Sequence, residues 1–302
     1  MNVRRQHYVP QAYLSAWTVS GSLFCLRDGK VFAASTRDVG QQRDFYRLRD
    51  LTDEDIAIVE MMIRRLPEHV QTDAHGLLER FARVPRLRKH VEAIGSAGAE
   101  ALKELDLLAN SMEEEMHGLV ESSGLPFVKR MLDCDTSFLA DSKAAPAFLH
   151  FLSLQNFRTK RVRERVLGMQ RDSGIPITFE RSWNVLCHIL ATSTTWSLYN
   201  DRHKLRLVLL DNATGVPLMT GDQPLINLLS GGDWPPPEKL AWYYPLSPAR
   251  AMVLTEPPYI YASERVQLSV DDVHRLNGRI HSASHEQLYS VSREQLEAMQ
   301  RT

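Results

Sequence analysis

A long helical region enclosed by strand-like segments constrains the fold of this chain more than any other feature. From residue 52 to residue 197 apolar side chains recur mostly at helical spacing, whereas residues 22–36 and 204–256 have the shorter period of strands. A C-terminal helix and strand follow at 270–302. Because strands and helices fall into separate runs, the sequence predicts a helix-rich α+β fold: a mainly antiparallel sheet, with a long helical insertion between its two strand segments. We expect residues 1–302 to form a single domain, since neither strand segment is stable alone.

Turn residues set the expected limits of the strands. Asp28-Gly29 lies between two short apolar runs and favours a type I′ turn, which predicts a β-hairpin over 22–36. Residues 205–222 are predicted to form a second hairpin that turns near Asn212. Prolines divide residues 242–256 into two further strands.

Cap residues and apolar spacing set the expected helices. Thr52 stands before three acidic residues, which is typical of a helix N-terminus. We expect the longest helix at about 145–170, with Pro146 near its start, and a further helix at 270–284 followed by a strand at 287–292. The aromatic residues expected to be buried are Trp17, Phe45, Tyr46, Phe151 and Phe157.

Charge and cysteine content limit the classes of partner. Lys and Arg number 36 and Asp and Glu 37, so no overall field draws nucleic acid to the molecule. The three cysteines lack CxxC spacing, as expected for reduced thiols in a cytosolic protein. The N-terminus has no apolar segment of a signal peptide, and there is no apolar run of ~18 residues. The sequence therefore predicts a cytoplasmic protein with no membrane partner.

Common catalytic motifs are missing. The sequence contains no GxGxxG, GxxxxGK[ST], HExxH, GxSxG or EF-hand pattern. Their absence argues against a dinucleotide enzyme, a P-loop ATPase, a zinc peptidase of that type and an α/β-hydrolase. Candidate functional residues must therefore come from less familiar patterns.

The N-terminal segment holds the first candidate. His7 lies between Gln6 and Tyr8, and the segment is stiffened by Pro10. A histidine held in one orientation is suited to general acid or base catalysis. The alternative is that His7 and Tyr8 only anchor the N-terminus by hydrogen bonds.

Gln155 and Arg158 form the second candidate, because they lie three residues apart on one face of the most apolar part of the predicted helix. An arginine in such a place needs an anion. That anion is either a carboxylate of the protein or a bound phosphate or carboxylate, and the sequence does not decide between them.

Three acidic positions complete the candidates. Asp222, between Gly221 and Gln223-Pro224, is suited to binding a metal or orienting a histidine; the alternative is an Asx-type turn within its own loop. Glu60 lies within an apolar run, where Arg64 at i+4 is its expected partner. Glu113 and His117 have metal-ligand spacing, but their acidic surroundings predict a solvated helix face.

Several of these stretches also follow the motif order of a known family. They are His7 to Gln11 with Tyr13, Leu14 and Trp17 behind it, Asp44-Phe45-Tyr46, Glu60, Gln155-x-x-Arg158-Thr159, Thr220 to Pro224, Tyr244 to Pro248, and Asn277. From about residue 6 to residue 292 the chain therefore resembles the uncharacterised family called domain of unknown function 4238. Lys160, Gly221 and Gln223 depart from the family's usual residues. The resemblance implies a shared architecture and no particular function.

These residues favour chemistry at a phosphate, where positioning and charge stabilisation supply most of the catalysis. The leading hypothesis is a nuclease-like phosphodiester hydrolase with His7 and Asp222 as catalytic residues. The predicted substrate contacts are Gln155, Arg158, Tyr8, Gln11 and Asn277. The cofactor is not identified by sequence; Mg²⁺ or Mn²⁺ is the expected ion, with Asp222 and Glu60 as candidate ligands.

A second hypothesis comes from another class. The same residues suit a non-catalytic binding or sensor module that recognises a small anionic ligand or a partner protein. Under the first hypothesis the partner is nucleic acid or a nucleotide, and the sequence names no protein partner. A third reading gives all of these polar groups a structural role. The three differ in whether the groups face one open pocket.

Overall fold

The computed structural model describes residues 5–172, 174, 178–231 and 237–300. The helices are α1 (Gln11–Leu14), α2 (Asp53–Ile63), α3 (Glu68–Glu92), α4 (Ala99–Leu132), α5 (Ala145–Phe157), α6 (Lys160–Asp172), α7 (Trp183–Asn200), α8 (Val270–Ala283) and α9 (Arg293–Met299). The strands are β1 (Arg5–His7), β2 (Leu23–Arg27), β3 (Lys30–Ala34), β4 (Gln41–Arg43), β5 (Arg206–Asp211), β6 (Thr220–Gly221), β7 (Ile226–Asn227), β8 (Ala241–Ser247), β9 (Arg250–Thr255), β10 (Arg265–Gln267) and β11 (Gln287–Ser290). The helix-rich α+β class is confirmed.

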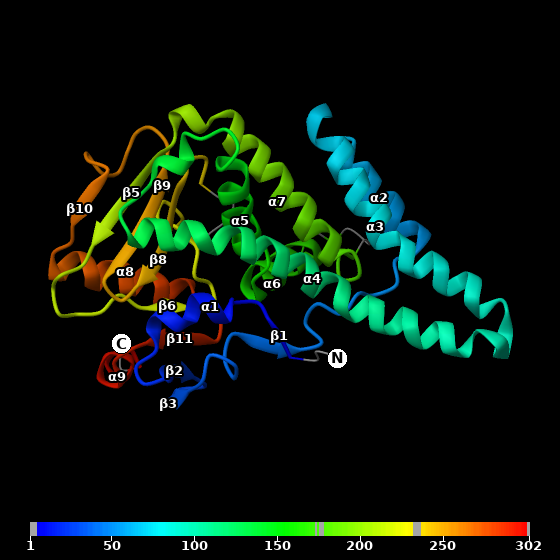
Figure 1. The fold of residues 1–302 in the computed structure, drawn as a ribbon, viewed down its shortest axis with the longest axis horizontal. Coiled ribbons are helices and arrows are strands. Elements are labelled where there is room, and N and C mark those ends of the chain that lie inside the picture. The colour runs from blue at the N-terminus through cyan, green and yellow to red at the C-terminus, as the bar shows by residue number, and fades with distance from the viewer. Residues whose placement is uncertain (1–4, 173, 175–177, 232–236, 301–302) are drawn as a thin grey trace.

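The strands are divided among separate sheets (Figure 1). One has the order β10-β5-β9-β8-β7, another β3-β2-β11-β6, and β1 pairs with β4. All pairs are antiparallel except β10 with β5. Residues 22–36 and 204–256 therefore share a sheet only through β6, and not throughout as expected. The expectation of a single domain over 1–302 stays a prediction.

The hairpin predicted over 205–222 is wrong. β5 pairs with β9, while β6 pairs with β11 in the other sheet. Side chains hold the connecting segment away from β5: the Asn212 amide donates to the carbonyls of Val216 and Pro248. The chain thus crosses from one sheet to the other, a change that local sequence does not encode.

Other strand predictions are confirmed. The β2–β3 hairpin turns at Asp28 and Gly29, whose φ angles of 51° and 67° are those of a type I′ turn. The expected strands in 242–256 are β8 and β9, which pair with each other. The C-terminal prediction is confirmed as α8 followed by β11, and α9 comes after them.

The helical layer covers one face of the larger sheet, and α8 covers the other. Val273, Leu276 and Ile280 of α8 pack in one cluster with β5, β8 and β9. On the opposite face, α4 and α5 belong to a second cluster that includes Phe148 and Phe151. Figure 1 shows this sandwich on the left and the α3–α4 hairpin extending to the right.

The long helix predicted at 145–170 is two helices, because the chain turns after Phe157. The side chains of the next two residues both form hydrogen bonds to segments that are distant in the sequence. Arg158 donates to the His7 carbonyl, and Thr159 donates to Gln223. The longest described helix is instead α4, which passes close to α5 at Gly124; any side chain there would overlap the Phe151 ring.

The N-terminal helix boundary and the buried aromatics agree with expectation. Thr52 caps α2 in a capping box with Asp55. Trp17, Phe45, Tyr46 and Phe151 are buried, and Phe157 is half-buried.

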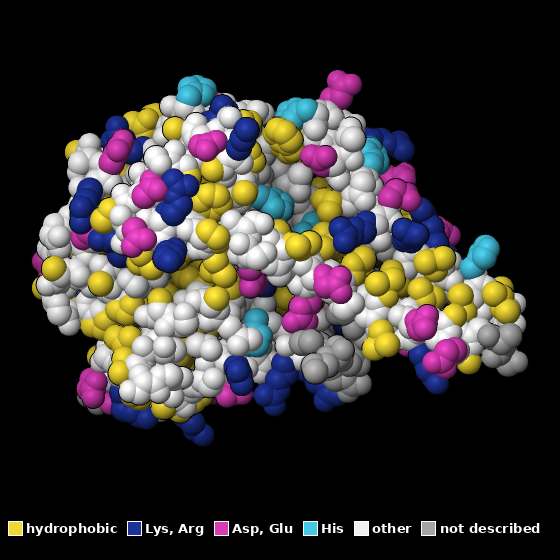
Figure 2. Space-filling model, viewed as in Figure 1, with side chains coloured by type: hydrophobic (Ala, Val, Ile, Leu, Met, Phe, Trp, Pro, Cys, Tyr) yellow, Lys and Arg dark blue, Asp and Glu magenta, His cyan; other side chains and the backbone are white. Residues whose placement is uncertain are grey.

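The projecting end of the helical layer carries exposed apolar side chains (Figure 2). The exposed large apolar residues of the α3–α4 hairpin as a whole are Leu87 on α3, Ile94 in the connection, and Leu107, Leu108 and Leu119 on α4. Among the described residues, no helix combines the length and the apolar character needed to cross a membrane.

Candidate functional site

Arg158 connects the N-terminal segment to the helices. It stands at the C-terminal end of α5, and its side chain is 3% exposed. Nη1 contacts the Glu121 carboxylate on α4 at 2.5 Å. Nε donates to the Tyr46 hydroxyl at 2.9 Å, and Nη2 donates to the His7 carbonyl at 2.5 Å. Of the two kinds of anion considered for Arg158, the structure therefore shows a carboxylate of the protein. Burial lowers the pKa of Arg158, but the contacts with Tyr46 and Glu121 outweigh burial and raise it.

The imidazole of His7 lies next to this arginine. Its Nδ1 is 3.2 Å from the amide nitrogen of Gln11, so with that amide as donor the ring proton is on Nε2. Nε2 is buried and has no hydrogen-bond partner among the described residues. Burial lowers the pKa of His7, so the ring is neutral at pH 7.

Tyr8 and Gln155 extend the same group. The Gln155 amide donates to the Tyr8 carbonyl at 3.5 Å, and the Tyr8 hydroxyl accepts a 3.0 Å hydrogen bond from Gln287. The structure thus brings together five predicted residues, although they come from segments far apart in the chain. They are His7, Tyr8, Gln11, Gln155 and Arg158.

Asp222 is connected to this group through Gln287, which contacts both Tyr8 and Asp222. Its two oxygens accept the main-chain N–H groups of His285, Glu286 and Gln287 at 2.7–3.0 Å. Burial raises the pKa of Asp222 while these hydrogen bonds oppose the rise. The donors belong to the turn between α8 and β11, not to the aspartate's own loop as the Asx-type turn required. These contacts hold that turn in place, and a catalytic or metal-binding role for Asp222 stays a prediction.

Asn277 and Glu60 lie apart from the group. Asn277, on α8, accepts the Met219 N–H and donates to the Pro217 carbonyl, which fixes the segment before β6. Glu60 is partly exposed on α2 and forms the expected ion pair with Arg64, at 3.7 Å. Substrate or metal binding by these two residues stays a prediction.

A buried group that the sequence analysis set aside lies on the other side of Tyr46. Glu113 and His117 on α4 and His188 on α7 are at most 2% exposed. The prediction of a solvated face for Glu113 and His117 is wrong. Both lie on the same inward-facing stripe of α4 as Met112 and Met116. The helical spacing of those two methionines is the sequence signal that would have revealed the burial of Glu113 and His117.

The electrostatics of the group favour a charged Glu113 and a neutral His117. Burial alone would raise the pKa of Glu113, but the two imidazoles outweigh it and hold that pKa at about 2. Burial and the charge of Arg158 lower the pKa of His117 to about 3. At neutral pH Glu113 is therefore an anion and His117 is neutral.

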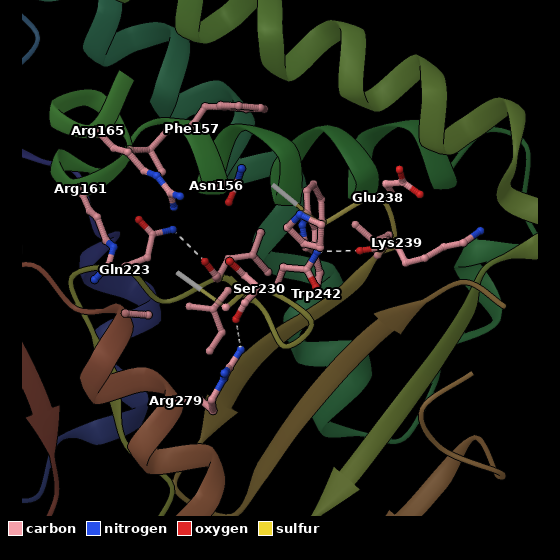
Figure 3. Close-up of a pocket in the computed structure, with 18 of the residues that line it drawn as sticks. Asn156, Phe157, Arg161, Arg165, Gln223, Ser230, Glu238, Lys239, Trp242 and Arg279 are labelled. Atoms are coloured by element: carbon pink, nitrogen blue, oxygen red, sulfur yellow. Dashed lines mark hydrogen bonds between the residues drawn. The ribbon is translucent and has the colours of Figure 1, made fainter. Parts of the chain in front are cut away.

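A cavity of about 620 Å³ adjoins the ends of α5 and α6. Apolar side chains of these helices, of α7 and of the β7–β8 region form much of its wall, including Phe157, Leu198 and Trp242. The cationic side chains at the cavity are Arg161, Arg165, Lys239 and Arg279. In Figure 3, Arg161 and Arg165 approach from α6, Arg279 from α8, and Lys239 lies across the cavity.

Two family-like motifs meet at this cavity through residues next to those predicted. Thr159 donates to Gln223, and Gln223 donates to the Leu225 carbonyl at 2.8 Å. Asn156 and Gln223 line the cavity, while their neighbours Gln155, Arg158 and Asp222 do not. The predicted residues Gln155, Arg158 and Asp222 therefore lie in segments that border the cavity but outside its wall, and their functional roles stay predictions.

The fold and the site define a helix-rich α+β protein with a buried polar cluster and a cavity whose wall includes three arginines and a lysine. The family model described as "Protein of unknown function (DUF4238)" matches residues 5–294, nearly the whole chain. The protein belongs to that family, which confirms the resemblance. No curated protein and no solved structure matches the chain.

Proposed function

We propose that the protein is a binding module for a small anionic ligand, which it holds in the cavity between α6, α8 and the β7–β8 region. The observation that carries the proposal is the pair Arg161 and Arg165, which lie one helical turn apart and face the same cavity. The positive charge of Arg165 and, more strongly, burial lower the pKa of Arg161. A bound anion relieves this repulsion.

The hydrogen-bond partners of Arg161 and Arg279 are uncharged. Arg161 donates to the carbonyls of Ser282 and Ser284, and Arg279 donates to those of Leu228 and Ser230. Among the described residues, neither arginine has a carboxylate within 4.0 Å, the limit of an ion pair. Main-chain carbonyls orient a guanidinium without neutralising it, so both remain available to a phosphate or carboxylate.

The remaining wall suggests the body of the ligand. Trp242 and Phe157 offer aromatic surface, and the carboxylates of Glu238 and Glu256 lie at the cavity as hydrogen-bond acceptors. A nucleotide combines a phosphate, a flat ring and amino donors, and a cavity of this size accommodates one. No described residue at the cavity is a histidine or cysteine, which favours binding over catalysis.

Titration calorimetry of the full chain with inorganic phosphate and nucleoside monophosphates tests the proposal. Arg161→Gln and Arg165→Gln should each weaken binding by about ten-fold or more, the effect of losing one charge-assisted hydrogen bond. Arg171→Gln is the matched control, because it removes the same charge from the exposed end of α6 and should leave binding unchanged. Absence of binding to the whole panel, or equal losses in all three variants, would overturn the proposal.

Phosphodiester hydrolysis is a second candidate, favoured by the neutral His7 beside Arg158. His7→Ala, Arg158→Ala and Asp222→Ala should each abolish cleavage of RNA, DNA or nucleotide substrates assayed with and without Mg²⁺ or Mn²⁺. His7→Ala should leave the Tm nearly unchanged, because the His7 ring has fewer contacts than the other two side chains. An inert wild-type protein rejects this candidate. Both candidates assume a cytoplasmic location, which the three unpaired cysteines support.

A further inference from the structure

Glu113, His117 and His188 converge at the contact between two long helices. The His117 Nε2 atom is 3.4 Å from Glu113 Oε1, and the His188 Nε2 atom is 3.3 Å from the same oxygen. One ligand atom from each residue lies within 4.8 Å of the other two. A carboxylate and two imidazole nitrogens from two helices thus point at one small volume.

Their polar atoms are not satisfied by hydrogen bonds. Nε2 of both histidines and Oε2 of Glu113 are buried and have no hydrogen-bond partner among the described residues. The two contacts therefore have suitable distances without hydrogen-bond geometry. Buried polar atoms without partners destabilise a protein, so such a set calls for a ligand.

Two of the three donor separations match those of a metal centre. Donors about 2.0–2.1 Å from a tetrahedral ion are separated by roughly 3.3–3.4 Å, and both contacts to Glu113 have that length. Two imidazoles and one carboxylate suit Zn²⁺ or Fe²⁺, whereas Mg²⁺ and Ca²⁺ prefer oxygen donors alone. Water takes the remaining coordination position in sites with three protein ligands.

Aromatic rings hold the two imidazoles in place. Tyr46 packs on His117 with ring centroids 4.2 Å apart, and Phe81 packs on His188 at 5.7 Å. Apolar side chains around the group include Val185 and Ile189 of α7, while the positive charge of Arg158 also acts on His117. The three ligands are at most 2% exposed and do not line the cavity between α6 and α8, so the place suits an ion that joins helices more than one that meets a substrate.

We propose that Glu113, His117 and His188 bind one divalent transition-metal ion, of the Zn²⁺ or Fe²⁺ class, that cross-links α4 to α7. The site is separate from the cavity of the proposed function and does not depend on it. The competing explanation is a carboxylate that accepts hydrogen bonds from the N–H groups of two neutral imidazoles without any ion.

Metal content of the purified full chain separates these explanations. After expression with added zinc and iron salts, elemental analysis should find about one ion per chain, as for a single three-ligand site. His117→Gln and His188→Gln should lower that content by about ten-fold or more. His150→Gln is the matched control, because it removes a neighbouring histidine of α5 that lies outside the group, and its metal content should equal that of the wild type.

A second measurement remains decisive if the ligand variants do not fold. Chelation of the wild-type protein should lower its Tm, and added Zn²⁺ should restore it. Co²⁺ added to the chelated protein should give the visible absorption of a tetrahedral nitrogen–oxygen site. Less than about one ion per ten chains after reconstitution, with no Tm response and no Co²⁺ absorption, would show the ion-free explanation to be correct. Equal metal loss in His150→Gln would also overturn the proposal.

Discussion

The ring of Tyr46 packs against the imidazole of His117, with ring centroids 4.2 Å apart and an angle of 35° between the ring planes. Its hydroxyl at the same time accepts a hydrogen bond from Arg158. One side chain therefore joins two buried polar groups: the Arg158 cluster and the Glu113–His117–His188 group. Because a buried charge is stabilised by each of its hydrogen-bond partners, the loss of this hydroxyl should lower the stability of the helices that carry the two groups.

Tyr46→Phe tests that connection. The substitution keeps the ring on His117 and removes the hydroxyl that accepts from the Arg158 Nε atom and donates to the His7 carbonyl at 3.4 Å. We expect a loss of about 1–3 kcal/mol in the free energy of unfolding, the effect of leaving a buried donor unpaired. Denaturant unfolding measures it, with Tyr259→Phe as a control because the Tyr259 hydroxyl donates from an exposed position. A loss no larger than that of the control contradicts the prediction.

Phe151→Ala tests the packing of α5. Phe151 is 1% exposed and contacts Gly124 of α4 and the ring of Tyr244 on β8. Truncation leaves a cavity among three elements, so we expect a loss of about 3–5 kcal/mol in unfolding free energy. Leu119→Ala, at an exposed position of α4, should change stability by less than about 0.5 kcal/mol. A loss below about 1 kcal/mol for Phe151→Ala would mean that the surrounding residues collapse into the space.

Elements defined by nearby residues could be predicted from the sequence. The β2–β3 turn depends on Asp28 and Gly29, and the start of α2 depends on Thr52 and Asp55, which lie within one turn of each other. Such boundaries require no knowledge of the rest of the chain. The limits of α8 belong to the same kind, because Ser269 and Asp272 form a second capping box.

Pairings over long distances could not be predicted. β6 leaves the sheet of its sequence neighbours because Asn277 holds the Met219 N–H and β11 offers a free edge. The end of α5 likewise depends on Arg158 reaching His7, which is 151 positions away. Nothing in the local sequence marks either event, since both arise from side chains that meet only after folding.

The candidate site shows the same division. Polar residues among apolar neighbours correctly pointed to buried groups such as Gln155 and Arg158. Burial alone does not distinguish a structural residue from a binding residue, and no pattern in the sequence singled out Arg161, which lines the cavity. The burial of Glu113 and His117 was missed for a different reason. Their segment is acidic on average, and this average does not reveal the one stripe of α4 that faces inward.

Gly221→Ala tests a departure from the usual family residue. A Cβ at this position would overlap the side chain of Ser284 and approach the Gln287 carbonyl. We expect a loss of about 1–3 kcal/mol, the usual effect of overpacking, by thermal or denaturant unfolding. Ser284→Gly in the same chain should restore part of it. Gly118→Ala is the control, because open space surrounds that helical position and alanine should stabilise it slightly. A neutral Gly221→Ala would show that the α8–β11 turn shifts freely.

His150 should make the protein sensitive to mild acid. Burial, with a smaller contribution from His188, lowers the pKa of His150 to about 4, whereas the unfolded chain has a value near 6.5. Between these values the unfolded state binds a proton that the folded state excludes, so the stability present above pH 6.5 falls as the pH falls. The loss by pH 5 is at most about 2 kcal/mol, because the ring also borders a surface groove. His150→Gln should therefore reduce the stability difference between pH 7 and pH 5, measured by denaturant unfolding. His90→Gln, on the exposed face of α3, should not. Equal pH dependence in the wild type and His150→Gln would show that His150 takes up its proton in the folded protein as readily as in the unfolded chain.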